Sequence, residues 1–216
     1  MKTKNIVKAR GKIVKIKNGG QGYGTITLLI KEGPKESPTV FTLASPMDPE
    51  ITIGDTVEVR GHIRSTATYT DDIGKRRSDQ FFIADSVKPT KTELEMMCKV
   101  KGNTYYPDHY FSCGIVGSFI HFHKSADDWG RIYIATASET GRNTRIMLNY
   151  YLKGFLLKPD SFTKGDEIAL VADINVKFKE YETEDEKKET RKFENLFVED
   201  IVIVNKGDGK TIPTLE

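Results

Sequence analysis

The stretch Ile53-Gly-Asp-Thr-Val-Glu-Val-Arg-Gly-His-Ile63 has a counterpart in the second half of the chain, Lys164-Gly-Asp-Glu-Ile-Ala-Leu-Val-Ala-Asp-Ile174. In both stretches a Gly-Asp pair, which favours a turn, leads into a β run, with alternating apolar and polar side chains in the first stretch and a continuous apolar run in the second. Alternation with a period of two is typical of a β-strand with one buried face. The two stretches therefore predict strands that begin at tight turns, in two similar halves of the chain.

Two further matches occur in the same order along the sequence. Tyr23-Gly-Thr-Ile-Thr-Leu28 is similar to Trp129-Gly-Arg-Ile-Tyr-Ile134, and Phe82-Ile-Ala-Asp-Ser-Val87 is similar to Phe197-Val-Glu-Asp-Ile-Val202. The three matches are separated by 106, 111 and 115 residues, a drift that loops of different length would produce. Matches in a preserved order indicate an internal duplication.

Each half is predicted to contain five strands and no long helix, with Gly, Pro, Asn and Asp clusters as turns between the strands. The expected strands are Lys8–Lys17, Tyr23–Lys31, Pro38–Ala44, Thr56–Ser65 and Phe81–Val87, then Phe111–Phe119, Trp129–Ala137, Thr144–Tyr151, Glu167–Lys179 and Asn195–Val204. The fold class is all-β, with two five-stranded barrels, because closure removes exposed strand edges. The expected domains are residues 1–90 and 108–205, joined by a linker at 91–107 with a short helix at Thr92–Lys99, and followed by a flexible tail at 206–216.

Composition excludes some classes of protein. The 216 residues are 38% hydrophobic and 30% charged, which excludes a membrane span and argues against wholesale disorder. Net charge is +2, but residues 1–92 carry 16 basic and 10 acidic side chains, and residues 93–216 carry 17 and 21. The first seventeen residues hold seven basic side chains and no acidic one. Such a block is typical either of a solvated surface or of an arm that binds a polyanion.

The cysteines and the opening residues bear on the cellular compartment. Cys98 and Cys113 lie fifteen residues apart without a CxxC pattern, so we expect reduced thiols rather than a zinc site or a disulfide framework. The opening MKTKNIVKARGK has no apolar core followed by a small-residue cleavage site. A cytoplasmic protein is therefore expected.

The order of these elements resembles a known family. A strand, the loop Asn18-Gly-Gly-Gln-Gly22, a strand with Tyr23 beside a glycine, another strand, and the Gly54-Asp55 turn into a long hairpin with a charged tip resemble the oligonucleotide-binding (OB) fold. More narrowly, they are similar to the single-stranded-DNA-binding proteins, here as two Greek-key barrels in tandem. Two features depart from that family: residues 206–216 lack the acidic C-terminal tail of the bacterial proteins, and residues 93–216 are net acidic.

The resemblance implies binding of single-stranded DNA with little sequence preference, during replication, recombination or repair. It implies no cofactor and no membrane partner, and it allows replication or recombination proteins as further partners. A protein-interaction adaptor of a replisome or phage assembly, and an RNA-binding OB protein, remain as alternatives, because this fold serves several kinds of ligand.

A surface for single strands needs cations along the backbone and flat side chains on which bases stack. Trp129, Arg131 and Tyr133 share one strand face if Ile132 and Ile134 point into the barrel. On the next strand the outward positions, opposite Ile146, Leu148 and Tyr150, are Arg145, Met147, Asn149 and Tyr151. The alternative interpretation is that the aromatic residues cover the core or an interface.

The first half has more net positive charge and fewer aromatic side chains than the second. Only five of the 21 aromatic residues lie in residues 1–92. Tyr23, Thr25 and Thr27 are expected on the outer face, while the register of Phe41 is ambiguous. Cations expected to contact phosphates lie in the loops and hairpins that frame the two barrels: Lys15, Lys17, Lys75, Arg76 and Arg77, and at the base of the second hairpin Lys177, Lys179, Arg191 and Lys192. Solvated charged loops are the alternative.

Catalytic and metal sites are not expected. His121 and His123 would share a face of an extended segment, but no third metal ligand stands at a convincing spacing. The sequence contains no phosphate-binding loop of the Walker type, no Gly-x-Ser-x-Gly elbow and no HExxH. We therefore expect a binding protein rather than an enzyme.

Overall fold

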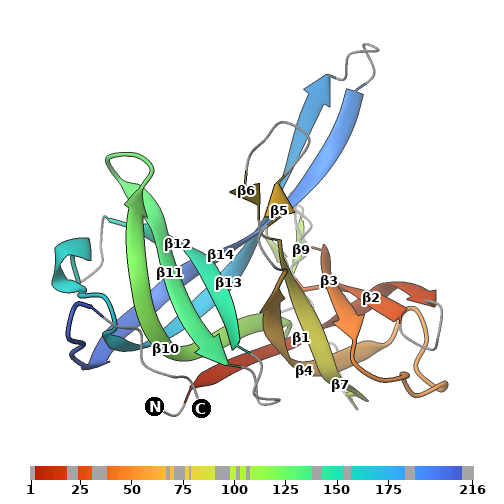
Figure 1. The fold of residues 1–216 in the computed structure, drawn as a ribbon. Coiled ribbons are helices and arrows are strands. Elements are labelled where there is room, and N and C mark those ends of the chain that lie inside the picture. Colours follow the sequence, from red (N-terminus) through yellow and green to blue (C-terminus); the bar gives the residue numbers. More distant parts are fainter. Residues whose placement is uncertain are drawn as a thin grey trace.

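The computed structural model is almost entirely β-structure (Figure 1). It describes residues 3–18, 24–30, 38–66, 69–70, 76–77, 79–90, 98–100, 103–105, 108–137, 143–152, 157–182 and 188–210. Alternating polarity creates the strands: in β1 (Lys4–Asn18) the buried side chains of Val7, Ala9 and Ile13 alternate with more exposed residues such as Lys8. Strand β1 begins four residues before the predicted Lys8, because its first residues pair with a strand of the second half.

The strands of the first half close into a ring. Strand β1 pairs with β2 (Gly24–Leu29), and β2 pairs with β3 (Pro38–Leu43), both in antiparallel orientation. Strand β3 runs parallel to β7 (Gln80–Pro89), which is antiparallel to β4 (Thr56–Ser65). Antiparallel pairing of β4 with β1 completes the first ring, so that none of its five strands is left as a fully unpaired edge.

The strands of the second half close in the same order. Strand β10 (Tyr110–Lys124) pairs with β11 (Trp129–Ala137), and β11 with β12 (Asn143–Tyr151). Strand β12 meets β14 (Lys188–Asn205) in parallel, β14 is antiparallel to β13 (Glu167–Glu182), and β13 pairs with β10 to complete the second ring. The far ends of β13 and β14 extend as a hairpin beyond both rings (Figure 1).

The two rings are joined by a ladder between their first strands. Strand β1 pairs with β10 in antiparallel register, from Lys4 opposite Val116 to Arg10 opposite Tyr110. All ten strands therefore belong to one continuous sheet. The ladder is centred on Val7 and Cys113, whose side chains are both buried, and burial raises the pKa of the Cys113 thiol to about 12.

The pairings of the two rings repeat at constant sequence separations. The register of β1 with β2 becomes that of β10 with β11 when 106 is added to each residue number, as from the pair Ile13 and Leu28 to the pair Phe119 and Ile134. The bulge after Ile13 recurs after Phe119. Adding 111 relates Gly54, at a φ of 103°, to Gly165, at a φ of 86°, so the two Gly-Asp turns are equivalent.

The third sequence match is one residue out of register. Gly61 pairs with Ala84, and its equivalent Ala172 pairs with Val198, which is a separation of 114 rather than 115 between the last strands. Asp85 and Glu199 are the extra residues at two equivalent bulges. The match of Phe82–Val87 with Phe197–Val202 instead pairs Asp85 with Asp200. These two residues are identical, whereas a bulge leaves no signal in the sequence.

Some short elements were not expected from the sequence. Two small hairpins are formed by β5 (Tyr69–Thr70) with β6 (Arg76–Arg77), and by β8 (Cys98–Val100) with β9 (Asn103–Tyr105). Strand β8 shows that the helix predicted at Thr92–Lys99 is wrong at Cys98 and Lys99, where pairing with β9 takes precedence over helix propensity; residues 92–97 lie outside the described residues. A 3₁₀ turn, η2, spans Pro159–Ser161. Within the described residues, none of the helical segments has the length and apolar character needed to cross a membrane.

The second Gly-Asp turn is held by a fully buried carboxylate. Asp166 accepts hydrogen bonds from the backbone of Gly207 at 2.7 Å and of Thr163 at 2.9 Å, and from Lys206 Nζ at 3.0 Å. Burial raises the pKa of Asp166, but these three donors outweigh burial and hold it below its ordinary value of 3.8. They also tether residues 206–210, the start of the predicted tail, to the second ring.

We expect Asp166→Asn to lower the free energy of unfolding by about 1–3 kcal/mol, because a buried charged acceptor with three donors is lost. Asp55→Asn is the matched control in the equivalent turn, where the carboxylate is partly exposed and, among the described residues, accepts its bonds from the neighbouring Thr52; it should cost less than about 1 kcal/mol. Urea unfolding measures both.

The same variants should differ in their response to acid. Since the pKa of Asp166 is lowered on folding, its contribution is complete above pH 3.8, its ordinary pKa, and is lost as the pH falls further. Asp166→Asn should therefore show a flatter loss of stability below pH 4 than the wild type. Equal costs for the two variants, or an acid profile of Asp166→Asn identical to that of the wild type, would contradict this account of the turn.

Candidate functional site

Strand β11 presents three of the predicted binding residues on one face. Ile132 and Ile134 are fully buried in the core of the second ring, as the alternation predicted. Trp129, Arg131 and Tyr133 point to the opposite face, where all three are half-buried. The guanidinium carbon of Arg131 lies 5.7 Å from the centre of the Trp129 ring, so the cation covers part of the indole.

Strand β12 extends this face. Ile146, Leu148 and Tyr150 are buried, as predicted, and Arg145 and Tyr151 are exposed, with Met147 half-buried between them. The register places Tyr151 opposite Trp129 and Met147 opposite Tyr133. Residues opposite each other in a ladder share a face, so residues of two strands form one surface.

Asn149 does not belong to the exposed part of that surface. It was predicted to point outward, but only 8% of it is exposed, and its Nδ2 donates a hydrogen bond to the carbonyl oxygen of Leu196 at 3.3 Å. This bond supports the parallel contact of β12 with β14, which consists of the pair Asn149 and Phe197. The approach of β14, which the sequence of β12 cannot reveal, covers the amide.

Two aromatic side chains on this surface, His121 and Phe197, were not among the predicted binding residues. His121 stacks on Tyr133, with ring centres 4.3 Å apart and planes inclined by 15°. Phe197 stacks on Tyr151 at 5.2 Å and 7°. Phe197 could have been found from its place between the buried Leu196 and Val198, whereas His121 reaches this face through the β10 bulge. We call Trp129, Tyr133, Tyr151, His121 and Phe197 the aromatic face.

At neutral pH the positive charge beside the aromatic face comes mainly from Arg131 and Arg145. Partial burial lowers the pKa of His121 below its ordinary 6.5, and the neighbouring His123 and Arg145 lower it further. This shift favours the uncharged form of the imidazole that stacks on Tyr133. The Nε of Arg131 is buried and has no hydrogen-bond partner within the described residues. In the part of the chain that the structure describes, no three His, Cys, Asp or Glu side chains form a group able to hold a metal ion.

The equivalent face of the first ring has different chemistry. Subtracting 106 relates His121 and His123 to Lys15 and Lys17, which are exposed. The same shift relates Arg131 and Tyr133 to Thr25 and Thr27, which lie half-buried opposite the buried Ile26 and Leu28. Tyr23, the counterpart of Trp129, lies outside the described residues, and Phe41 is fully buried.

The predicted hairpin cations are only partly described. The backbone of Arg76 and Arg77 forms β6, and Lys75 lies outside the described residues. In the second ring Lys179 pairs with Arg191, and the backbone positions of Lys177 and Lys192 lie on the same β13–β14 hairpin. The hairpin's base is thus basic in sequence, and its far end extends beyond both rings (Figure 1).

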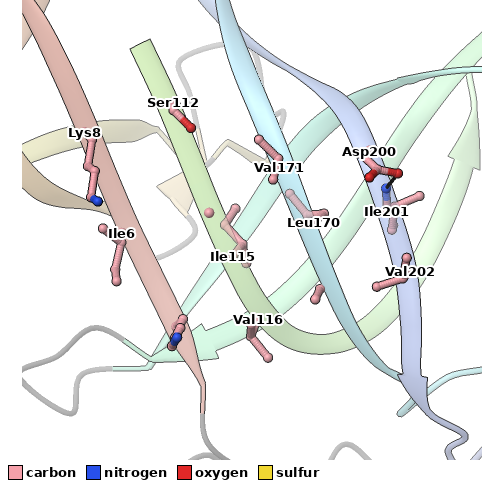
Figure 2. Close-up of a pocket in the computed structure, with 13 residues that line it drawn as sticks. Ile6, Lys8, Ser112, Ile115, Val116, Leu170, Val171, Asp200, Ile201 and Val202 are labelled. Atoms are coloured by element: carbon pink, nitrogen blue, oxygen red, sulfur yellow. Dashed lines mark hydrogen bonds between the residues drawn. The ribbon is translucent and has the colours of Figure 1, made fainter. Parts of the chain in front are cut away.

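A groove of about 400 Å³ lies on another surface of the sheet (Figure 2). Its floor is formed by β1, the first half of β10, β13 and β14, and includes Ile6, Val116, Val171 and Val202. Because the aromatic face lies mainly on β11 and β12, the groove and the aromatic face are separate surfaces. The fold does not require an apolar groove. Ala169 pairs with Val202 in the groove, whereas the equivalent pair in the first ring, Glu58 with Lys88, is charged.

No protein-family model matches the sequence, and no curated protein sequence is similar to it. The fold is similar to solved structures of the single-stranded DNA binding protein from Thermus aquaticus. The wild-type structure aligns with a TM-score of 0.58 and 10% identity, over 98% of this chain and 98% of that chain. A deletion mutant of that protein aligns with a TM-score of 0.57 and 10% identity, over 95% and 97%. At this identity the similarity shows the fold alone, and it confirms the predicted all-β class with an OB barrel.

Gly130, the second residue of β11, is required for close packing. A Cβ atom there would overlap the ring of Phe122 and lie 2.7 Å from the carbonyl oxygen of His123. Phe122 packs edge-on against the buried Tyr150, so it cannot move freely. We expect Gly130→Ala to lower the free energy of unfolding by about 1–3 kcal/mol. The control Gly114→Ala, where no atom lies within 4 Å of the added Cβ, should change it by less than about 0.5 kcal/mol. Denaturant titration compares them, and equal effects would contradict this packing argument.

Proposed function

We propose that this protein binds single-stranded DNA with little sequence preference and covers unwound strands in replication, recombination or repair. The observation that carries the proposal is the aromatic face, with Arg131 over Trp129 and stacked rings on both sides. Unpaired bases stack on such rings, and every base has a π-face, so the binding tolerates any sequence. The fold of the Thermus aquaticus single-stranded DNA binding protein over nearly the whole chain supports the proposal.

In this proposal the two rings are tandem OB barrels derived by duplication, within residues 1–90 and 108–205. Support comes from the registers that repeat at separations of 106 and 111 residues, including the bulge and the turn glycines. The second barrel contributes stacking. The first barrel contributes mainly charge, through Lys15 and Lys17 on the equivalent face and through its hairpin.

The mechanism combines two physical terms. Stacking contributes about 1–3 kcal/mol per base and depends weakly on salt, because it buries apolar surface. Phosphate contacts release counterions, so their contribution falls steeply as salt concentration rises. Arg131 can act in both terms, since its guanidinium stacks on Trp129 while its Nε is not used by the described protein groups.

A protein-interaction adaptor is the second candidate, and the apolar groove of Figure 2 favours it. RNA is a further possible ligand, because a stacking surface accepts either sugar. Titration of labelled single-stranded DNA and RNA of equal sequence separates these functions. Saturable binding of single strands supports the proposal, preference for RNA replaces DNA as the ligand, and absence of binding to either leaves the adaptor.

Trp129→Ala should weaken binding of single-stranded DNA by roughly 5- to 150-fold, the equivalent of one lost stack. Fluorescence anisotropy of a labelled oligonucleotide measures this, since the variant removes the only tryptophan. Tyr110→Ala is the matched control, because Tyr110 is an exposed aromatic residue, 40% accessible, outside the aromatic face. A folded Trp129→Ala protein with unchanged affinity would remove the aromatic face from the proposed site.

Replacing Lys75, Arg76 and Arg77 with Glu should flatten the dependence of the binding constant on salt. Loss of three phosphate contacts would reduce the logarithmic slope by up to about 2 on a single strand. The control replaces three exposed lysines near the start of β13 with Glu, so that it has the same total charge as the hairpin variant: Lys158, Lys164 and Lys210. An equal change of slope in both proteins would mean that net charge, not hairpin contact, sets the salt dependence.

A further inference from the structure

Strand β12 has an edge that its own ring leaves largely open. Within the described residues its partners are β11 along one edge and, along the other, β14 at the single position Asn149. At Met147, beside the aromatic face, both backbone groups instead bond to a side chain of the first ring. The N–H of Met147 donates to Gln80 Oε1, and Gln80 Nε2 donates to the carbonyl oxygen of Met147 at 3.0 Å. The carboxamide of Gln80 thus replaces a missing strand partner.

A second contact lies three residues away on the same strand, at the side chain of Thr144. The N–H of Ser65 donates to Thr144 Oγ1 at 3.0 Å, and the two hydroxyls lie 2.6 Å apart. Ser65 and Gln80 are opposite each other in the ladder of β4 with β7. One rung of the first ring therefore contacts β12 at two points, the backbone of Met147 and the hydroxyl of Thr144.

This rung is the base of the first ring's basic hairpin. Beyond it, Thr66 and Asp79 continue the pairing with a backbone bond of 2.9 Å, and the hairpin then carries Arg76 and Arg77 on β6. On the other side of the contact, Met147 lies opposite Tyr133, which stacks with His121. The rung thus joins the base of the basic hairpin to the strand that carries the stacking surface.

The contact also supplements the ladder that joins the rings. One antiparallel ladder, between β1 and β10, fixes the rings along a single line and leaves twist about that line weakly restrained. The bonds of Gln80 and Ser65 attach β12 to the other side of the first ring. Two separate attachments restrain the relative orientation of the rings.

We propose that Gln80 is a positioning residue that holds the basic hairpin of the first ring in line with the aromatic face of the second, so that one DNA strand engages both. This inference rests on the proposed function and deepens it: the rung formed by Gln80 and Ser65 couples binding at the two rings. Joining two binding regions in fixed geometry raises affinity for a ligand long enough to span them, and leaves affinity for a shorter ligand unchanged.

The test replaces Gln80 with Met, which keeps the length of the side chain and removes both hydrogen bonds. Binding is measured for oligo-dT of about 8 nucleotides, within the range of a single OB barrel, and of about 30 nucleotides. We expect Gln80→Met to bind the short oligonucleotide within twofold of wild type and the long one roughly tenfold more weakly. Val171→Ala, an exposed strand position in the groove, is the control and should match wild type at both lengths.

The outcomes separate this inference from the proposed function. Equal losses at both lengths would mean that Gln80 supports only the local platform, and unchanged binding at both lengths would mean that the contact is not used; either result overturns the coupling. A wild type that binds neither oligonucleotide overturns the proposed function as well.

Hydrogen exchange tests the contact itself without DNA. We expect protection of the Met147 amide in the wild type and exchange roughly tenfold faster in Gln80→Met, the equivalent of one lost hydrogen bond. Amides of the ladder between β11 and β12 should stay unchanged and show that the variant is folded. An unprotected Met147 amide in the wild type would overturn the inference even if the variant failed to fold.

Discussion

The architecture depends on β1 and β10, which pair with each other and also with strands of their own rings along both edges. Strand β1 gives one edge to β4, and along the other edge it pairs first with β10 and then with β2. The change of partner occurs near Gly11, where an added Cβ would overlap the carbonyl of Leu29; the equivalent Gly117 meets Ala135 in the same way. Close backbone approach at a barrel corner requires glycine, so two small residues allow each ring to close and the rings to join.

The closed rings then determine what the second barrel can present. Because Ile132, Ile134, Ile146 and Leu148 fill its core, the intervening residues of β11 and β12 must point outward. The β10 bulge adds His121 to that surface, and the approach of β14 adds Phe197 and covers Asn149. The aromatic face is thus a consequence of barrel closure. Stacking of His121 on Tyr133 and of Phe197 on Tyr151 holds four of its five side chains.

The two rings carry different surface chemistry on strands that pair in the same order. Lysines and threonines in the first ring stand where histidines, Arg131 and Tyr133 stand in the second. On the sheet's other side, the charged pair Glu58 and Lys88 corresponds to the apolar pair Ala169 and Val202. Backbone pairing is indifferent to outward side chains, so the outer faces of the two rings differ while the core positions are apolar in both.

The sequence by itself determined the elements whose signal is local. Alternation placed the strands and the inward residues of β11 and β12, and the Gly-Asp turns related the halves, because side-chain period and turn chemistry depend on neighbouring residues. Tertiary structure alone decided which strands meet: the ladder of β1 with β10, the burial of Asn149, the stacking of His121 on Tyr133, and the capping of Met147 by Gln80. Each of these joins residues distant in sequence or follows from a bulge, and a one-residue shift in register leaves no trace in local composition.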